Sequence, residues 1–211
     1  MARFVMINKF DFTGFIIRAI AFAGIFAAHS AAAQDAYMAQ IGEGNTGANL
    51  ALGLQNTQRV VQAGIENTGV QIAMGIGNTS NLVQVGRQNA ALALNVGLSN
   101  TTNTVQFGAF NQAITGIQGV NNTVTTFQSG ILNQSAVQVR GNDTDVTVAQ
   151  SGFGRRLSLS VEDQMVPSSA ASSPSSAAGR LQVGVIQGRN DAPVAASIAR
   201  LPSGTIVINP R

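Results

Sequence analysis

Apolar and polar positions alternate along short segments in the middle of the chain, and short turns separate these segments. Residues 56–62 read Asn-Thr-Gln-Arg-Val-Val-Gln, and similar segments lie at 78–84, 100–106 and 122–128. They are rich in Val and Thr and contain no Pro, which favours β-strands. Because successive side chains of a strand face opposite sides, one position of each segment should point inward and the next outward. The inward set is Val60, Leu82, Thr104, Thr126 and Val148, and the outward set is Val61, Val83, Val105 and Phe127.

A Gln-x-Gly-x-x-Asn motif recurs every 22 residues, as the step from Gln40 to Gln62 illustrates. Its Gln positions are Gln40, Gln62, Gln84, Gln106, Gln128 and Gln150. Its Gly positions are Gly42, Gly64, Gly86, Gly108, Gly130 and Gly152, and its Asn positions are Asn45, Asn67, Asn89, Asn111 and Asn133. The sixth copy has Arg155 in place of Asn. Weaker copies, the first centred on Gly53, lie 11 residues after each of the first five motif Gly residues and divide each of these repeats into two arms.

An arm of 11 residues has room for one short strand and one tight turn, at which Gly and Asn accept positive φ. Two strands and two turns then form one rung, and successive rungs hydrogen-bond at the strand spacing of about 4.8 Å. We therefore predict an all-β fold, a two-sided β-solenoid over residues 34–156. In this register the motif Gln residues lie above one another, and so do the Asn residues. Columns of side-chain amides can hydrogen-bond along such a stack.

The repeat resembles the curlin repeat, S-x5-Q-x-G-x-x-N-x-A-x3-Q, over about residues 40–153. Ala91 and Ala113 occupy the small position after the motif Asn, whereas Asn replaces the opening Ser. The final Gln is replaced by Ala51, Ala73, Asn95, Ile117 and Val139, which leaves the type of subunit open. The resemblance implies a secreted curli-type subunit that crosses the outer membrane through secretion machinery. It further implies polymerisation, with itself and other curli-type subunits, into extracellular amyloid fibres on the bacterial cell surface that serve adhesion and biofilm.

The first 33 residues have the pattern of an export signal. Arg3, Lys9 and Arg18 precede the apolar run 19–28, and small residues end at Ala33. This pattern predicts a secretory signal peptide, residues 1–33, cleaved after Ala33. The apolar run is shorter than the roughly 20 residues of a membrane-spanning helix, so we expect no membrane span in the mature chain.

The region after residue 156 departs from the repeat. Residues 157–179 include a Ser-, Pro- and Ala-rich segment and are predicted to be a low-complexity linker, and residues 180–211 a basic tail. Gln182–Gln187 resembles the repeat out of phase, and residues 205–209 can form one more strand. A docking tail and a partly ordered terminus both fit this pattern.

Composition argues against an enzyme, because only 10% of residues are charged and the chain has no Cys. The only His and the only Lys, His29 and Lys9, lie in the predicted signal peptide. We therefore expect no catalytic residues, no cofactor and no metal site. The net charge is −2 over residues 34–153 and +3 from residue 154 onward, and no nucleic-acid motif accompanies the basic tail.

Both ends of a solenoid are open strand edges unless a cap covers them, and Asp35-Ala-Tyr-Met offers no obvious cap. We expect the rungs between Gln106 and Gln150 to drive assembly, since the earlier turns carry the charges Glu43, Glu66 and Arg87. The alternative is a secreted β-solenoid that does not polymerise and binds a surface such as ice. Its candidate surface is the outward column Thr57, Thr79, Thr101 and Thr123.

Overall fold

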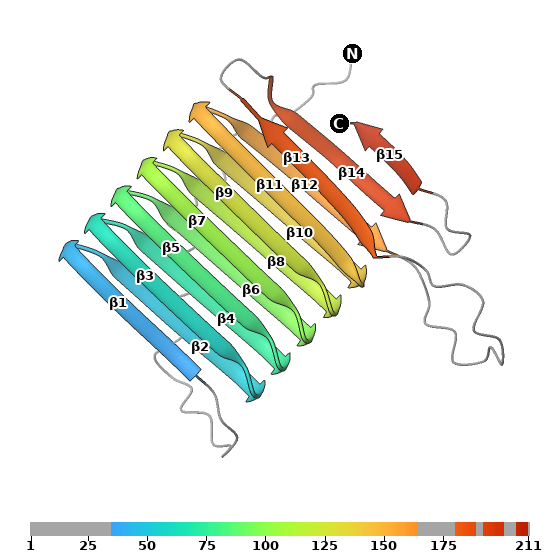
Figure 1. The fold of residues 1–211 in the computed structure, drawn as a ribbon, viewed down its shortest axis with the longest axis horizontal. Helices are drawn as coiled ribbons and strands as arrows, with labels where there is room; N and C mark the ends of the chain where they lie inside the picture. The colour runs from blue at the N-terminus through green and yellow to red at the C-terminus, as the bar shows by residue number, and fades with distance from the viewer. Residues whose placement is uncertain (1–34, 164–179, 189–191, 201–205, 211) are drawn as a thin grey trace, which may run out of the picture.

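The computed structural model describes residues 35–163, 180–188, 192–200 and 206–210, and all of its elements are β-strands (Figure 1). The first nine strands are β1 (Asp35–Glu43), β2 (Thr46–Leu54), β3 (Thr57–Ile65), β4 (Thr68–Ile76), β5 (Thr79–Arg87), β6 (Ala90–Leu98), β7 (Thr101–Ala109), β8 (Gln112–Val120) and β9 (Thr123–Ile131). The remaining six are β10 (Gln134–Asn142), β11 (Thr144–Phe153), β12 (Arg156–Asp163), β13 (Leu181–Gln187), β14 (Val194–Arg200) and β15 (Ile206–Pro210).

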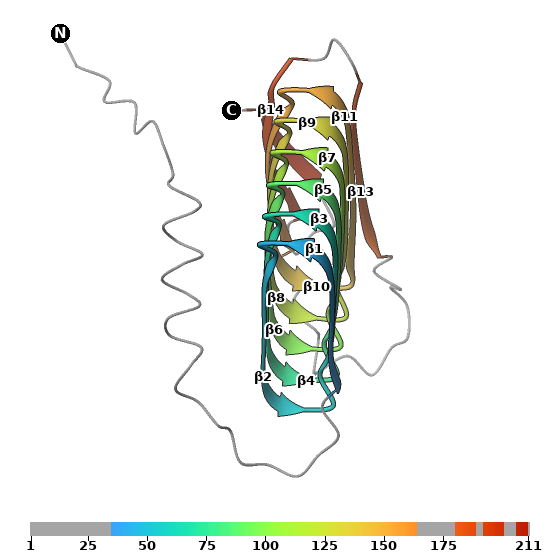
Figure 2. The same cartoon turned by 90° about the vertical axis from the view of Figure 1, so that its left-hand side faces the viewer.

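The strands alternate between two sheets that lie face to face (Figure 2). Sheet A has the order β1-β3-β5-β7-β9-β11-β13, and sheet B has the order β2-β4-β6-β8-β10-β12-β14-β15. All neighbours pair in parallel except β14 and β15. From β1 to β12 each residue pairs with the residue 22 positions later, as Gln40 with Gln62 and Gln62 with Gln84. The prediction of a two-sided β-solenoid with rungs of about 22 residues is therefore confirmed.

Each turn uses two residues with positive φ, and the motif Gly is the first of them. A Cβ on Gly64 would lie 1.9 Å from the backbone O of Gly86 in the next rung, so only Gly fits at this position. The second is the residue immediately before Asn, such as Glu66 (φ 54°) or Leu132 (φ 60°). The expectation that Asn itself takes positive φ is wrong. The Asn side chain has another function, described below.

Leu132 lies in this left-handed conformation with 42% of its surface exposed, although a branched apolar residue is strained there. Replacing Leu132 with Gly should raise the free energy of unfolding by about 1 kcal/mol, because the strain of roughly 1–2 kcal/mol disappears and little buried surface is lost. Urea unfolding measures the change. Ile131→Gly is the control: Ile131 is 45% exposed and belongs to β9 without positive φ, so this substitution should destabilise. Equal effects of the two substitutions would contradict the strain argument.

The core between the sheets changes character along the stack. Its largest apolar cluster belongs to the C-terminal rungs and contains Ile117, Val124, Val137, Val139, Val146, Val148, Leu157, Leu159, Val161, Leu181, Val183 and Ile198. Polar side chains are buried mainly in earlier rungs, and those outside the motif include Gln58, Gln71, Ser80, Asn95, Thr102, Thr104 and Thr115. Four of the five residues predicted to point inward are at most 1% exposed, and Thr104 is 2% exposed. Apolar burial therefore stabilises the C-terminal half most.

The stack continues beyond the predicted end of the repeat. Strand β12 extends to Asp163, so residues 157–163 belong to the solenoid and not to a linker. Strand β13 pairs with β11 so that Gln187, not Gln182, lies beside Gln150. The apparent change of phase arises because the connection before β13 is longer, whereas the ladder position itself is retained. The predicted signal peptide and residues 164–179 lie outside the described residues.

No helix of a length and hydropathy suited to crossing a bilayer occurs in the part of the chain that the structure describes.

Candidate functional site

The motif Gln side chains form one hydrogen-bonded column inside the solenoid, which we call the Gln ladder. Each Nε2 donates to the Oε1 of the Gln in the next rung, over 2.6 Å from Gln40 to Gln62 and 2.7–2.8 Å in the later steps. From Gln62 onward Nε2 also donates across the core to the first backbone carbonyl of a sheet B strand, as Gln106 does to Ala90 O at 3.1 Å. The ladder thus links the rungs to one another and sheet A to sheet B.

The motif Asn side chains form a second column at the turns. The Oδ1 of Asn89 accepts hydrogen bonds from the backbone N and from Nδ2 of Asn111, at 3.1 and 3.0 Å. The Nδ2 of Asn111 also donates to the backbone O of Gly130, at 3.0 Å. The same pattern holds at Asn45, Asn67 and Asn133, and along the opposite edge at Asn56, Asn78, Asn100 and Asn122. Each Asn therefore links two neighbouring turns. Its Nδ2 donates to the backbone O of the motif Gly in the next rung, as Asn111 does to Gly130.

Among the described residues, nothing covers the N-terminal end of the solenoid. No described strand lies beyond β1 in sheet A or β2 in sheet B (Figure 1). Met38 pairs with Val60 of the next rung and belongs to the same inward column. Val60 is fully buried, whereas Met38 is 40% exposed. Gln40, the first member of the ladder, is exposed as well, whereas Gln62 is fully buried. The first rung thus presents an uncovered core and an unfinished ladder.

At the C-terminal end the described residues cover the edge of sheet B and leave the edge of β13 in sheet A open, which corrects the expectation of two open ends for sheet B alone. Strand β15 pairs antiparallel with β14 and follows the outer edge of sheet B. The inward side chains of the last rung are buried, with Leu181 at 5%, Val183 at 8% and Ile198 at 9% exposure. The last ladder residue, Gln187, donates from Nε2 to the backbone O of Ala192 at 3.0 Å and of Arg156 at 3.1 Å. The chain itself therefore completes this end of the ladder.

A buried ion pair fixes β14 of the last rung to β12 of the rung before it. Arg200 donates from Nε to Oδ1 of Asp163 at 3.0 Å, and its Nη2 donates to the other carboxylate oxygen. The hydrogen bond to Asp163 raises the pKa of Arg200 above its usual value, although burial lowers it. A raised pKa of a cationic group contributes stability that is lost only as pH rises through the folded-state pKa. Alkaline conditions in the ordinary working range therefore leave Arg200 charged.

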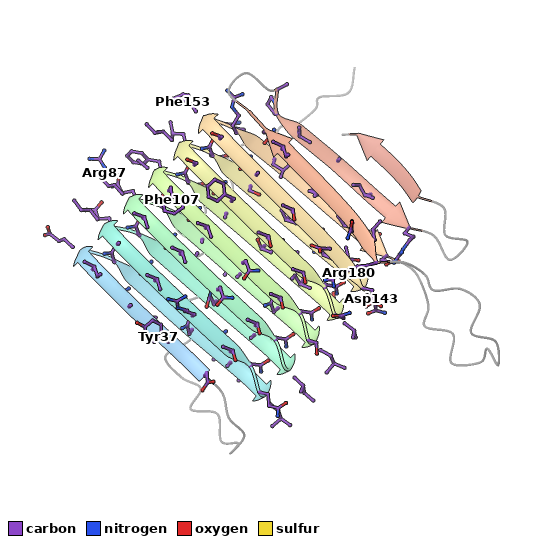
Figure 3. All side chains as sticks on the ribbon, viewed as in Figure 1. Tyr37, Arg87, Phe107, Asp143, Phe153 and Arg180 are labelled. Carbon is purple, nitrogen blue, oxygen red and sulfur yellow. The ribbon has the colours of Figure 1, made fainter. Side chains whose placement is uncertain are left out.

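The outer surface carries apolar rows at partial exposure. Phe107 and Phe127, 40% and 39% exposed, lie on neighbouring strands of sheet A with ring centroids 5.9 Å apart. Arg87 and Phe153 project from one edge of the stack (Figure 3), and the Arg87 guanidinium lies 5.5 Å from the centroid of the Phe110 ring. At the opposite edge Arg180 lies 3.8 Å from the carboxylate of Asp145. These rows extend along the stack and form no enclosed site.

Several residues with structural roles escaped the sequence analysis. Asp163 and Arg200 lie after the last copy of the motif, so the motif gave no signal for them. Gln187 was noticed only as the end of a segment out of phase with the repeat, and its place in the ladder was not predicted. Gln58 and Gln71 are buried without belonging to the motif, and Gln71 forms no side-chain hydrogen bond within the described residues. The described part of the chain contains no group of three or more His, Cys, Asp or Glu side chains that could hold a metal ion.

No protein-family model, curated protein or solved structure matches the chain.

Proposed function

We propose that the chain is a secreted subunit of an extracellular fibre of the curli type. It joins the fibre through stacking of its rungs on those of a neighbouring subunit, and the fibre serves adhesion and the biofilm matrix. The observation that carries the proposal is the open first rung, in which the edges of β1 and β2, the core residue Met38 and the ladder residue Gln40 are all uncovered. Open parallel edges are templates for another chain.

The internal construction supports the same proposal. The rungs from β1 to β12 repeat one backbone register, so a rung added from another copy finds the same pairing that exists inside the chain. Stacked identical amide side chains are a common feature of cross-β assemblies. The predicted cleavage after Ala33 also places β1, which begins at Asp35, at the start of the mature chain.

The test is the behaviour of the chain from Gln34 onward. We expect fibres that bind thioflavin and give a meridional reflection near 4.8 Å. Deleting residues 106–149, two rungs of 22, should abolish fibre formation, because it removes six of the twelve residues of the large apolar cluster. Deleting residues 40–83, also two rungs, removes none of that cluster. It joins Ala39 to Gln84, which takes the place of Gln40 in a new open first rung, so assembly should remain intact.

Fibre formation by the first deletion at the rate of the second would contradict the assignment of assembly to residues 106–149. Soluble monomer that persists in the undeleted chain for days, without the reflection near 4.8 Å, would contradict the fibre proposal itself.

A solenoid that binds ice or another flat surface and does not polymerise is the second candidate. The register places Thr57, Thr79, Thr101 and Thr123 beside one another in sheet A, as this function requires. The adjacent outward column is mixed, since it contains Arg59, Asn81, Asn103 and Thr125. A thermal-hysteresis assay on the monomer separates the two candidates.

A further inference from the structure

The Gln ladder has a direction, and its two ends are complementary. Every Nε2 donates towards the C-terminal rung, so the N-terminal end presents the acceptor Gln40 Oε1 and the C-terminal end the donor Gln187 Nε2. In the chain this last donor reaches the backbone O of Ala192. A second copy stacked head to tail would offer its Gln40 Oε1 to the same hydrogen. Two N-terminal ends would instead bring acceptor against acceptor.

The last rung has one strand in each sheet. Strand β13 is the last strand of sheet A, and β14 is the last parallel strand of sheet B. The β1 and β2 strands of a second copy would continue the alternation, with β1 on β13 and β2 on β14. Strand β15 already occupies the edge of β14, from Ala196 opposite Pro210 to Arg200 opposite Ile206. A strand edge pairs with one strand at a time, so β15 and an incoming β2 compete for it.

The contact between β14 and β15 is the weaker of the two that β14 makes. It spans five residue pairs, and one of them involves Pro210, which has no backbone N–H to donate. On its other side β14 pairs with β12 over seven positions and is held by the buried ion pair of Arg200 with Asp163. Separation should therefore occur between β15 and β14, which leaves the last rung in place.

We propose that β15 is a plug on the C-terminal end of the solenoid, which a second copy must displace before the fibre can grow there. This inference rests on the proposed function and adds its regulation and its direction. Growth proceeds head to tail, with the first rung of one copy on the last rung of the next. A copy whose plug is locked can still join a fibre through its first rung, but no further copy can add to its last rung, so growth of the fibre stops there.

A disulfide between β14 and β15 tests the plug. Ser197 and Asn209 are directly opposite each other, and the chain has no Cys of its own. Opposed residues of antiparallel strands have Cα atoms about 4.5–5.5 Å apart, within the range that a disulfide bridges. The chain from Gln34 to Arg211 with Ser197→Cys and Asn209→Cys should extend preformed seeds when reduced and lose this elongation when oxidised. Ser197→Cys alone, under the same oxidising conditions, is the matched control and should elongate.

Two further measurements use the oxidised protein and a shortened one. A gold-labelled tag after Arg211 of the oxidised protein should mark a single end of each fibre in electron micrographs. A stop after Arg200, which removes β15, should shorten the lag of unseeded assembly.

Equal elongation by the oxidised and reduced proteins would overturn the plug and leave the fibre proposal standing. Label along the whole fibre or at both ends would overturn it as well. A discrete dimer of the oxidised protein in sedimentation velocity would show that first rungs pair with each other, which overturns head-to-tail growth. Absence of fibres from both the reduced protein and the protein that ends at Arg200 would overturn the proposed function and the plug together.

Discussion

Gly108→Ala is expected to lower the free energy of unfolding by about 3 kcal/mol or more. Gly108 has φ +109°, which an L-residue with a side chain adopts only under strain of roughly 1–2 kcal/mol. The added Cβ would also lie 2.1 Å from the backbone O of Gly130, so the turns of two rungs must move apart. Such overpacking typically costs about 1–3 kcal/mol. The same carbonyl accepts the hydrogen bond from Asn111, so its displacement weakens the Asn column as well.

Urea unfolding of dilute monomer, followed by circular dichroism, measures this loss. Gly116→Ala is the control, because Gly116 lies within β8 without positive φ and a Cβ there would meet nothing within 4 Å. That substitution should be neutral or stabilising by up to about 1 kcal/mol, since it restricts the unfolded chain. If both substitutions destabilised equally, the close approach of Gly108 and Gly130 would not be the cause.

The uninterrupted period is the reason that the sequence predicts most of the fold. A spacing of 22 allows one register for every pair of neighbouring rungs, and that register places Gln over Gln and Gly over Gly. The alternation within each segment then assigns each side chain to the inside or the outside. Val60 inside and Phe127 outside follow from two rules that use no long-range information.

The features that the sequence did not predict lie where the 22-residue period gives no information. The position before the motif Asn holds residues as different as Glu66, Phe110 and Leu132. Their side chains share no property that indicates positive φ. Gln187 keeps its ladder place although 37 residues separate it from Gln150, because the register is set by pairing in space and not by spacing along the chain. The antiparallel direction of β15 likewise depends on a connection that carries no repeat.

The ladder itself is most directly tested by Gln106→Leu, which should lower the free energy of unfolding by about 3 kcal/mol. Gln106 is fully buried and accepts from Gln84 at 2.8 Å while it donates to Gln128 at 2.7 Å. A Leu of similar size leaves a ladder hydrogen of Gln84 and the Oε1 of Gln128 without partners, and the backbone O of Ala90 loses the hydrogen bond from Gln106 Nε2. Each buried polar group that loses its partner costs about 1–3 kcal/mol. The gain from burying an apolar side chain offsets part of this cost.

Thr126→Val is the matched control, because Thr126 is fully buried in the same core and its hydroxyl forms no hydrogen bond within the described residues. This substitution should be neutral or stabilising, since no partner is lost. The double variant Gln106→Leu with Gln128→Leu gives the sharper test. It leaves a ladder hydrogen of Gln84 and the Oε1 of Gln150 without partners, so within the ladder it has as many unsatisfied groups as the single variant, namely two. Its cost should therefore be clearly less than the sum of the two single substitutions. Strict additivity in urea unfolding would mean that the Gln side chains stabilise the solenoid independently and not as a connected column.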